Sequence, residues 1–356
     1  MNKRSIIAID IGYGNTKVVW SHSLDKQGRS RWGESCFRSI TPPMVVNEEE
    51  TGIASHPDRI LIELNGHSYY AGPAATLGVE ARALDPNYIE TDQHEVLLRV
   101  AIHLAMREAG RFTRDLDMLV LGLPVSGYAN RGRRLRELAL QPRVIPVPKQ
   151  FRDQVQGAES IEVRAKNCLI LPQPFGGLFA AAQNLPSDDP IYQSGKLTMI
   201  IDPGYRTLDW FVSNGMTPDL KLSGSYDGGV SNILREVSQR IGYDEGTGSL
   251  EFDQVEAGLI NGQINLGFKV IDMKPYAKLA YDAARREISA FLGRIDANRT
   301  SLSRVLLTGG GAKFYEAALS EKLPGYQIES LPNSVMSNAR GYWLCACDQF
   351  NSVDES

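Results

Sequence analysis

Short apolar runs alternate with polar, glycine-containing turns along the whole chain of 356 residues. Several runs have the length and the valine, isoleucine and leucine content that are typical of buried strands, and turn residues bound each of them. Longer stretches between these runs carry apolar residues at the three- and four-residue spacing of amphipathic helices. This alternation predicts an α/β protein in which helices cover the faces of β-sheets.

The predicted strands lie at residues 5–10, 17–21, 60–72, 117–124, 163–174, 196–213 and 303–308. The predicted helices lie at residues 95–110, 129–140, 175–185, 228–242, 275–295 and 312–319. Asn65-Gly66 predicts a tight turn between two strands in the first of the longer ranges. The residues after Asp348 have the composition of a polar tail.

Two strand–turn–strand segments follow one design. In Ile6–Thr16 and again in Met199–Asp209, an apolar strand ends in aspartate, a glycine turn and a threonine follow, and a second strand begins. Asp10 and Asp202 stand at the corresponding strand ends. The recurrence predicts that the chain contains two copies of one α/β unit.

The two turns have the composition of phosphate-binding loops. Glycine lets the backbone N–H groups approach a phosphate closely and permits positive φ. A carboxylate at the strand end can hold a hydrated Mg²⁺ beside the phosphates. The candidate residues are Gly12, Tyr13, Gly14, Asn15, Thr16 and Lys17 in the first turn, and Gly204, Tyr205, Arg206 and Thr207 in the second.

Three further elements are candidates for the same site. A run of three glycines between a strand and a helix lets the backbone approach a base, ribose or phosphate. A glutamine after a buried strand can orient a water for attack on a γ-phosphate. A glycine pair before a helix offers another approach. The alternatives are an ordinary strand–helix turn for the glycine run, a strand-end polar residue for the glutamine, and a plain helix N-terminus for the glycine pair. The residues are Gly309, Gly310 and Gly311; Gln173; and Asp227, Gly228 and Gly229.

Other functional classes lack their motifs. The chain has no G-x-x-x-x-G-K-[ST] motif, and a strand follows its first turn, so neither a P-loop nor a Rossmann site is expected. It also lacks G-x-S-x-G, H-E-x-x-H and a credible Cys/His pair. No apolar run is long enough to cross a bilayer, and the aspartate that follows the basic start makes a poor signal peptide.

Net charge and cysteine content exclude few further functional classes. The formal net charge of −4 predicts no general affinity for nucleic acid or for anionic membranes. A local basic cluster is expected to form a solvated helix face or a protein contact, and direct nucleic-acid binding is not expected. The four cysteines, without metal-ligand spacing, are expected to be reduced thiols in a cytoplasmic protein. The cluster consists of Arg131, Arg133, Arg134, Arg136 and Arg143.

The elements, in their order along the chain, resemble those of the actin-like ATPase superfamily, which includes actin, the heat-shock chaperone ATPase domains and the sugar kinases. Within this superfamily, LGLPVSGYANRGRR, LNGHSYYAG and DPGYRTLDW are similar to segments of the ParM/StbA plasmid-segregation actins. The superfamily elements called phosphate-1, connect-1, phosphate-2, adenosine and connect-2 correspond here to Asp10–Lys17, Gln173–Ala180, Asp202–Asp209, Leu307–Ala312 and Ser334–Gly341.

The resemblance implies the actin-like ATPase fold, with two duplicated ribonuclease-H-like domains and a nucleotide cleft between them. Domain I is expected at residues 1–165 plus 335–356, with a small subdomain at about 31–90, and domain II at residues 166–334. It also implies that Asp10 and Asp202 place Mg²⁺ and its waters, and that Gln173 positions the attacking water. The two glycine turns would contact the phosphates, and the glycine run would lie against the adenosine.

Two residues depart from the family pattern. The ParM group often has a glutamate where this chain has Gln173, and a carboxamide cannot serve as a strong general base, so slow hydrolysis is expected. Pro203 stands where glycine or leucine is more usual. Because proline has no backbone N–H, the second turn is expected to offer one phosphate donor fewer.

The resulting prediction is a nucleotide-dependent, filament-forming ATPase that uses Mg²⁺ and ATP, with GTP as an open alternative. Its subunits would assemble through heterologous contacts and segregate plasmid DNA through an adaptor protein. Two alternatives with the same fold stay open. One is a small-molecule kinase, for which Asp92 or Asp117 would supply the carboxylate base. The other is an ATP-binding regulator that does not polymerise.

Overall fold

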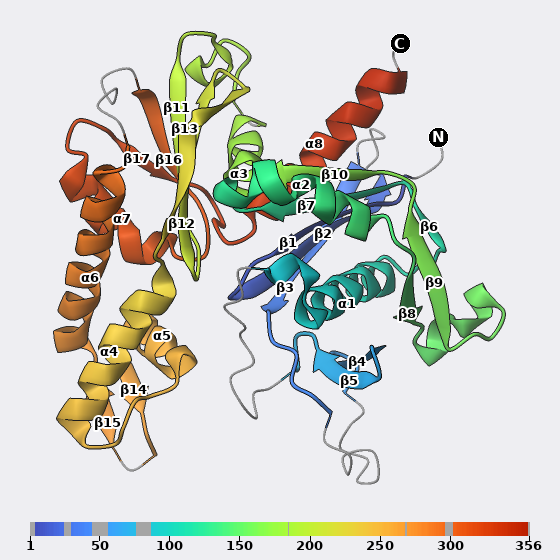
Figure 1. The fold of residues 1–356 in the computed structure, drawn as a ribbon, viewed down its shortest axis with the longest axis horizontal. Coiled ribbons are helices and arrows are strands. Elements are labelled where there is room, and N and C mark those ends of the chain that lie inside the picture. Colours follow the sequence, from blue (N-terminus) through green and yellow to red (C-terminus); the bar gives the residue numbers. More distant parts are fainter. Residues whose placement is uncertain are drawn as a thin grey trace. The chain divides into compact units, whose positions relative to one another are not determined.

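A computed structural model describes residues 4–24, 30–44, 56–75, 87–183, 185–267, 269–295 and 302–354. The chain divides into two compact units, Met1–Gln183 with Met336–Ser356, and Asn184–Val335 (Figure 1). The predicted boundary between residues 165 and 166 would assign β10 (Cys168–Pro172) and α3 (Gln173–Ala182) to the second unit. They lie in the first unit because β10 pairs with β7 in its sheet and α3 packs against α8.

The first unit is built on a five-stranded sheet in the order β10-β7-β1-β2-β3. The first three strands of the chain form an antiparallel meander, β7 runs parallel to β1, and β10 runs parallel to β7. The further strands of this sheet are β1 (Ile6–Ile11), β2 (Asn15–Leu24), β3 (Ser30–Arg38) and β7 (Met118–Leu123).

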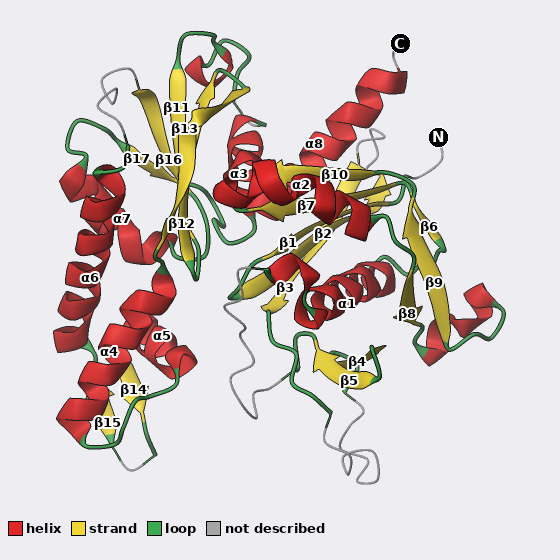
Figure 2. Ribbon diagram, viewed as in Figure 1, coloured by secondary structure: helices red, strands yellow, loops and turns green. Residues whose placement is uncertain are grey.

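Helices cover both faces of this sheet (Figure 2). Ile7 and Ile9 of β1 point into a core that they share with α1 and α2. Ile6 and Ala8 point the other way, into a core shared with α3 and α8. This alternation places Asp10 on the α3 side of the sheet, because side chains two residues apart in a strand share a face. The helices are α1 (Asp92–Glu108), α2 (Val125–Ala139) and α8 (Ser337–Asp354).

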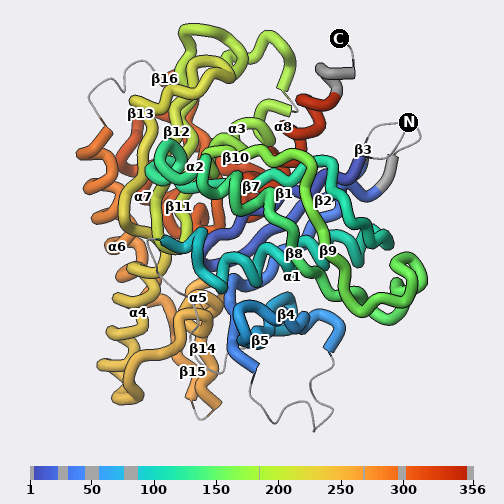
Figure 3. Tube along the Cα trace, turned by 45° about the vertical axis from the view of Figure 1, so that its right-hand side comes forward, coloured from blue at the N-terminus to red at the C-terminus, as the bar shows by residue number. Residues whose placement is uncertain are grey.

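Smaller elements surround this sheet. The predicted Asn65-Gly66 turn is confirmed: both residues have positive φ, 52° and 79°, as a two-residue hairpin turn requires. The hairpin lies beside α1 (Figures 1 and 3). A small three-stranded sheet has the order β6-β9-β8. These elements are β4 (Ile60–Leu64), β5 (His67–Ala71), β6 (Asp115–Leu116), β8 (Arg143–Pro146), β9 (Ser160–Ala165), η1 (Tyr88–Glu90) and η2 (Lys149–Val155).

The second unit repeats the strand order of the first. Its sheet reads β13-β12-β11-β16-β17, with an antiparallel meander of β11, β12 and β13, β16 parallel to β11, and β17 parallel to β16. The prediction of a duplicated unit is therefore confirmed. The strands are β11 (Leu197–Pro203), β12 (Thr207–Asn214), β13 (Thr217–Asp227), β16 (Leu302–Leu307) and β17 (Ile328–Ser330).

One core of the second unit lies between its sheet and its helices, and Met199 and Ile201 of β11 point into it. Asp202 therefore lies on the opposite face, as Asp10 does relative to Ile7 and Ile9. The remaining elements are η3 (Pro190–Tyr192), α4 (Val230–Glu245), α5 (Phe252–Asn261), β14 (Gln263–Asn265), β15 (Val270–Asp272), α6 (Lys274–Leu292) and α7 (Ala312–Lys322).

The prediction of a polar tail after Asp348 is wrong, because α8 continues to Asp354. This helix packs against α3 where two glycines meet. A Cβ on Gly341 would lie 1.7 Å from the carbonyl oxygen of Gly176, and a Cβ on Gly176 would lie 2.4 Å from the carbonyl oxygen of Asn338. Only glycine permits the two helix backbones to approach so closely.

We expect Gly341→Ala to lower the free energy of unfolding by about 2 kcal/mol or more, because α8 must move away from α3 to admit the methyl group. Urea unfolding followed by circular dichroism would measure the change. Gly325→Ala is the control, because a Cβ there meets nothing within 4 Å. Equal stability of the two variants would contradict the close packing described here.

Two buried histidines of α1 make stability depend on pH. Burial lowers the pKa of His94 and of His103 to about 4, because the interior disfavours the charged imidazolium. Both rings are therefore neutral in the folded protein at neutral pH. The unfolded chain takes up these protons near pH 6.5, so between pH 6.5 and 4 the unfolded state binds more protons than the folded state.

We expect stability to be fully present above pH 6.5 and to fall as the pH approaches 4, by up to about 3 kcal/mol for each histidine. Urea unfolding at several pH values would measure this. His103→Gln keeps a donor for the Pro146 carbonyl, 2.8 Å from Nδ1 in the wild type, and should flatten the profile. His67→Gln, at an exposed position, should leave it unchanged. An identical slope in His103→Gln would contradict the assignment.

Candidate functional site

The first turn is closed by a backbone hydrogen bond from the Gly12 N–H to the carbonyl of Asn15, 3.1 Å long. This turn sets Asp10 directly opposite Lys17 in the β1–β2 pair. The Asp10 side chain is buried, and its Oδ2 accepts a hydrogen bond from Lys17 Nζ at 3.0 Å. Burial of the carboxylate is offset by this ion pair, which also holds the ammonium group beside the turn.

Gln173 contacts the same carboxylate. It is the first residue of α3 rather than the last of a strand, and its Nε2 donates to Asp10 Oδ1 at 3.0 Å. The structure thus brings together Asp10, Lys17 and Gln173, which the sequence analysis placed in one site. With its N–H group directed at Asp10, the carboxamide presents Oε1 as the acceptor for a water or ligand.

Side chains around the first turn hold it in place. Tyr13 stacks on Tyr88 of η1, with ring centroids 4.6 Å apart. Thr16 and Ser39 share a buried hydrogen bond of 2.9 Å between their hydroxyl oxygens, and the Ser39 N–H donates to the carbonyl of Gly14. The hydroxyl of Thr16 is therefore engaged within the protein. These contacts favour a structural role for Thr16 over direct phosphate contact.

The second turn has the same geometry as the first. The Gly204 N–H donates to the carbonyl of Thr207 at 2.7 Å, and Asp202 lies directly opposite Asp209 in the β11–β12 pair. Matching the hydrogen bonds pairs Gly12 with Gly204, Tyr13 with Tyr205 and Asn15 with Thr207. The corresponding segments Asp10–Lys17 and Asp202–Asp209 have this same register.

Asp209 is a site residue that the sequence analysis did not single out. It takes the place of Lys17, is 2% exposed, and accepts hydrogen bonds from Thr207 Oγ1 at 2.8 Å and from Ser225 Oγ. The Asp202 side chain, also buried, points to the same face of the sheet. The identical spacing from the strand-end aspartate was the signal that could have identified it.

The glycine run lies against the second turn. Gly309 has φ +83°, and a Cβ there would fall 1.9 Å from Asp202 Oδ1. The Gly311 N–H donates to the carbonyl of Pro203 at 2.9 Å. A Cβ on Gly310, in contrast, would meet nothing within 4 Å. Asp202 and the glycine run therefore form one continuous surface, and only Gly309 and Gly311 are packed closely within it.

The Gly228-Gly229 pair supports the second turn. A Cβ on Gly229 would lie 2.7 Å from the carbonyl oxygen of Gly204. The first two N–H groups of α4 donate to the carbonyls of Gly204 and Tyr205, and the third donates to Gly229. Arg206 forms an ion pair with the exposed Asp227 at 3.5 Å. Since these helix donors are engaged, the geometry gives this element a role in holding the turn; its contact with a ligand stays a prediction.

Most arginines of the basic cluster form hydrogen bonds or ion pairs within the protein. Arg143 is buried, donates to the carbonyls of Leu138 and Ala139, and pairs with Glu95. Arg136 donates to the carbonyl of Cys168, and Arg134 pairs with Glu90. Arg133, 94% exposed, pairs with Glu137. Arg133, Arg134 and Arg136 are exposed on α2, as predicted for a solvated helix face, whereas Arg143 is wrongly included because it is buried in β8.

Three further features concern the cysteines, metal-binding groups and membrane-spanning helices of the described residues. All four cysteines are free thiols; Cys168 and Cys345 are buried, Cys347 is half-buried and Cys36 is exposed. Within the same ranges, no group of three or more His, Cys, Asp and Glu side chains is placed to bind a metal ion. No described helix is both long and apolar enough to span a membrane.

Two family models match the chain, one on each unit. Residues 8–176 match the N-terminal domain of actin-like proteins, and residues 200–321 match the C-terminal domain of the archaeal, MreB-like actin homologues. The paired strand-end aspartates, the repeated turns and the glycine run lie within these matches. The chain belongs to the actin-like ATPase superfamily, as its motifs predicted, and the ParM-like likeness is supported by relatives of known structure.

Similar proteins include archaeal actin homologues and bacterial ParM proteins. An archaeal actin homologue of Thermoplasma volcanium is 24% identical over 352 residues, 95% of this chain and 97% of the relative. A crystallised archaeal actin homologue has a TM-score of 0.74 at 20% identity, covering 97% of this chain and 99% of its own, and has also been solved with ADP. ParM in a 15-stranded Clostridium botulinum filament has a TM-score of 0.73 at 21% identity, over 98% and 100%. These likenesses confirm the actin-like fold.

The site geometry predicts opposite outcomes for two neighbouring glycines. Gly309→Ala should lower the free energy of unfolding by about 2 kcal/mol or more, because the methyl group meets Asp202 at a positive φ. Gly310→Ala should leave stability within about 0.5 kcal/mol of the wild type. Urea unfolding of both variants would measure the difference. A Gly309→Ala variant as stable as the wild type would contradict the placement of Asp202 against the glycine run.

Proposed function

We propose that this chain binds ATP through its two turns and its glycine run, and that nucleotide binding controls its assembly into filaments. The observation that carries the proposal is the repeated turn, closed by the same hydrogen bond in both units and carrying a buried aspartate at the same position. Backbone N–H groups in such turns suit phosphate oxygens. The open space beside Gly310 suits a flat base or a ribose.

The carboxylates fit a magnesium ion. In the first unit Asp10 already has Lys17 and Gln173 as partners, which leaves little unsatisfied negative charge. In the second unit Asp202 and Asp209 lie on one face of the sheet, and the hydroxyl groups of Thr207 and Ser225 donate hydrogen bonds to Asp209. Two neighbouring carboxylates favour a nearby cation, and Mg²⁺ prefers oxygen ligands and retained waters. We therefore assign Mg²⁺ to Asp202, with Asp10 as the second holder, as predicted; bound there, it would neutralise phosphate charge.

Gln173 is the proposed water-positioning residue. Its Nε2 is anchored on Asp10, which fixes the orientation of the carboxamide and leaves Oε1 to accept a hydrogen bond from a water. A carboxamide orients a water but does not take its proton strongly, so ATP hydrolysis is expected to be slow. A slow reaction would let subunits assemble before the nucleotide is hydrolysed.

The filament part of the proposal rests on relatives. ParM from Clostridium botulinum forms a 15-stranded filament, and ParM from Bacillus thuringiensis has been solved with ATP. By analogy, this chain would assemble in the cytoplasm through heterologous contacts and move plasmid DNA through an adaptor protein.

Both candidate base residues of the small-molecule kinase alternative have other hydrogen-bond partners. Asp117 precedes β7, which runs parallel to β1, so it lies at the opposite end of the strands from Asp10. Its carboxylate accepts hydrogen bonds from the Ser5 N–H and from Lys166. Asp92 accepts hydrogen bonds from Asn65 and Tyr69 at the β4–β5 hairpin. Both carboxylates have structural partners. Neither Asp92 nor Asp117 is placed to take a proton from a substrate hydroxyl beside the first turn.

The test is ninety-degree light scattering at several protein concentrations with Mg-ATP, Mg-ADP and no nucleotide. We expect scattering to rise above a critical concentration with Mg-ATP only, and Asp202→Asn to abolish the rise and weaken binding of a fluorescent ATP analogue at least tenfold. The control is Asp188→Asn, at an exposed position of the same unit. Tight ATP binding without a rise in scattering would support the nucleotide site but refute filament assembly. It would favour the alternative of an ATP-binding regulator that does not polymerise.

A further inference from the structure

The first turn of α3 is poorly secured by its own residues. Gln173, the proposed water-positioning residue, is the first residue of this helix. The N-cap residue is Pro172, which forms no side-chain hydrogen bond to the helix start, and Pro174 has no backbone N–H. Gly176 and Gly177 then add two residues of low helix propensity. The backbone of Gln173 therefore needs contacts from outside α3 to be held in one position.

Two buried side chains of α8 supply such contacts. The Tyr342 hydroxyl donates a hydrogen bond to the carbonyl of Gln173 at 3.3 Å, and the Gly177 N–H donates to Asn338 Oδ1 at 3.1 Å. The carbonyl of Gln173 and the N–H of Gly177 are four residues apart, the spacing that an α-helix joins by its own hydrogen bonds. The C-terminal helix therefore contacts both polar groups of the first turn of α3.

The Tyr342 side chain fits between β7 and α3 because glycines leave room for it. A Cβ on Gly122 of β7 would lie 2.1 Å from the Tyr342 hydroxyl oxygen, and a Cβ on Gly176 would lie 2.5 Å from Cε1 of its ring. A buried hydroxyl destabilises the protein unless it has a hydrogen-bond partner, whereas phenylalanine would fill most of the same space without that requirement. The distinctive contribution of tyrosine here is its contact with the carbonyl of Gln173.

The side chain of Gln173 is held at its other end by Asp10. Its Nε2 donates to Asp10 Oδ1 at 3.0 Å, so Asp10 orients the carboxamide while α8 holds the backbone of the same residue. We propose that Tyr342 is a positioning residue for ATP hydrolysis, because its hydroxyl holds Gln173 where Oε1 can orient the attacking water. The inference rests on the function proposed above for Gln173. A displacement of about 1 Å is enough to slow a reaction that depends on orientation.

The first test needs no nucleotide and follows the side-chain ¹H–¹⁵N resonances of Gln173 in the full chain. Gln173→Glu removes these resonances and so assigns them. We expect Tyr342→Phe to move them toward the positions of an exposed glutamine such as Gln254, because the carboxamide loses its fixed contact with Asp10. Resonances that stay in place in Tyr342→Phe would overturn the proposal.

The second test measures steady-state ATP hydrolysis. We expect Tyr342→Phe to lower kcat about fivefold, the size expected for the loss of one intramolecular hydrogen bond, and to change KM by less than about twofold. The matched control is Tyr69→Phe, which removes a hydroxyl that donates to Asp92 at 3.1 Å and should leave kcat unchanged. An unchanged kcat in Tyr342→Phe would contradict the positioning role, because a merely structural hydroxyl affects stability without this division between kcat and KM.

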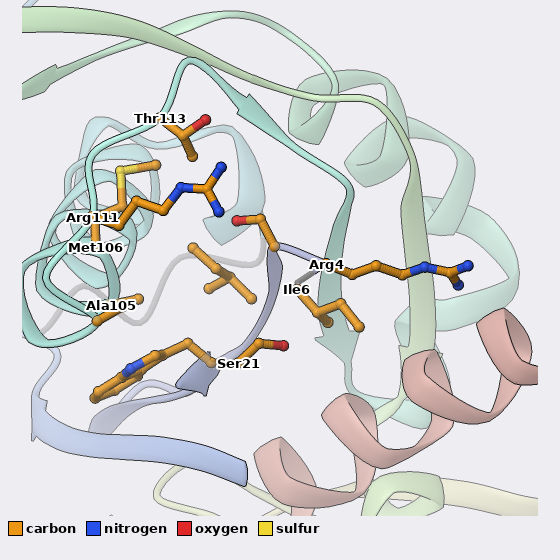
Figure 4. A pocket seen from close by; sticks show the side chains of 11 residues that line it. Arg4, Ile6, Ser21, Ala105, Met106, Arg111 and Thr113 are labelled. Atoms are coloured by element: carbon orange, nitrogen blue, oxygen red, sulfur yellow. The ribbon is translucent and has the colours of Figure 1, made fainter. Parts of the chain in front are cut away.

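A second control separates positioning from a general loss of stability. Met106 is buried and lines a small cavity beside the starting residues of β1, at the opposite end of the strand from Asp10 (Figure 4). Met106→Ala should lower stability more than the loss of one hydrogen bond does, yet leave kcat unchanged at a temperature where the variant is folded. An equal fall of kcat in Met106→Ala and Tyr342→Phe would assign the effect to stability and refute the proposal.

Two further provisions keep the test decisive. If Tyr342→Phe does not fold, Asn338→Ala replaces it, because this variant removes the acceptor of the Gly177 N–H from the same turn of α3 and should change the Gln173 resonances and kcat in the same direction. If the wild type does not hydrolyse ATP, the proposed function fails separately, and the Gln173 resonances alone then decide whether Tyr342 positions this residue.

Discussion

One backbone hydrogen bond in each unit determines the geometry of the site. It joins the glycine N–H to the carbonyl three residues later, from Gly12 to Asn15 and from Gly204 to Thr207. By closing the turn at a fixed length, it fixes which residues of the two strands lie opposite each other. Cross-strand partners share a face, so a change of one residue in the turn would move every neighbouring side chain to the other side of the sheet.

The two copies preserve this geometry and differ in charge. Where the first unit pairs Asp10 with Lys17, the second sets Asp202 opposite Asp209. The first carboxylate thus has a cationic partner across the strand pair, whereas the second has another carboxylate opposite it. The two units share one turn geometry, and single residues opposite the strand-end aspartates give the units different charges.

The sequence predicted the larger features well and the local contacts poorly. The α/β class, the duplication and the Asn65-Gly66 turn follow from apolar spacing and turn chemistry, which act over a few residues. The unit boundary was placed too early, because α3 is held by α8, which comes more than 150 residues later in the chain. Asp209 was not singled out, because residue type alone does not show which side chains lie opposite each other in a strand pair.

The glycine contact between α3 and α8 also has a consequence for the order of synthesis. The second unit is inserted between two helices that pack on the same face of the first sheet. Domains generally fold as they leave the ribosome, N-terminal part first. Here, the strands that α8 covers lack this helix until α8 itself has been synthesised. The part of this sheet face that α8 covers therefore stays uncovered while the second unit is translated.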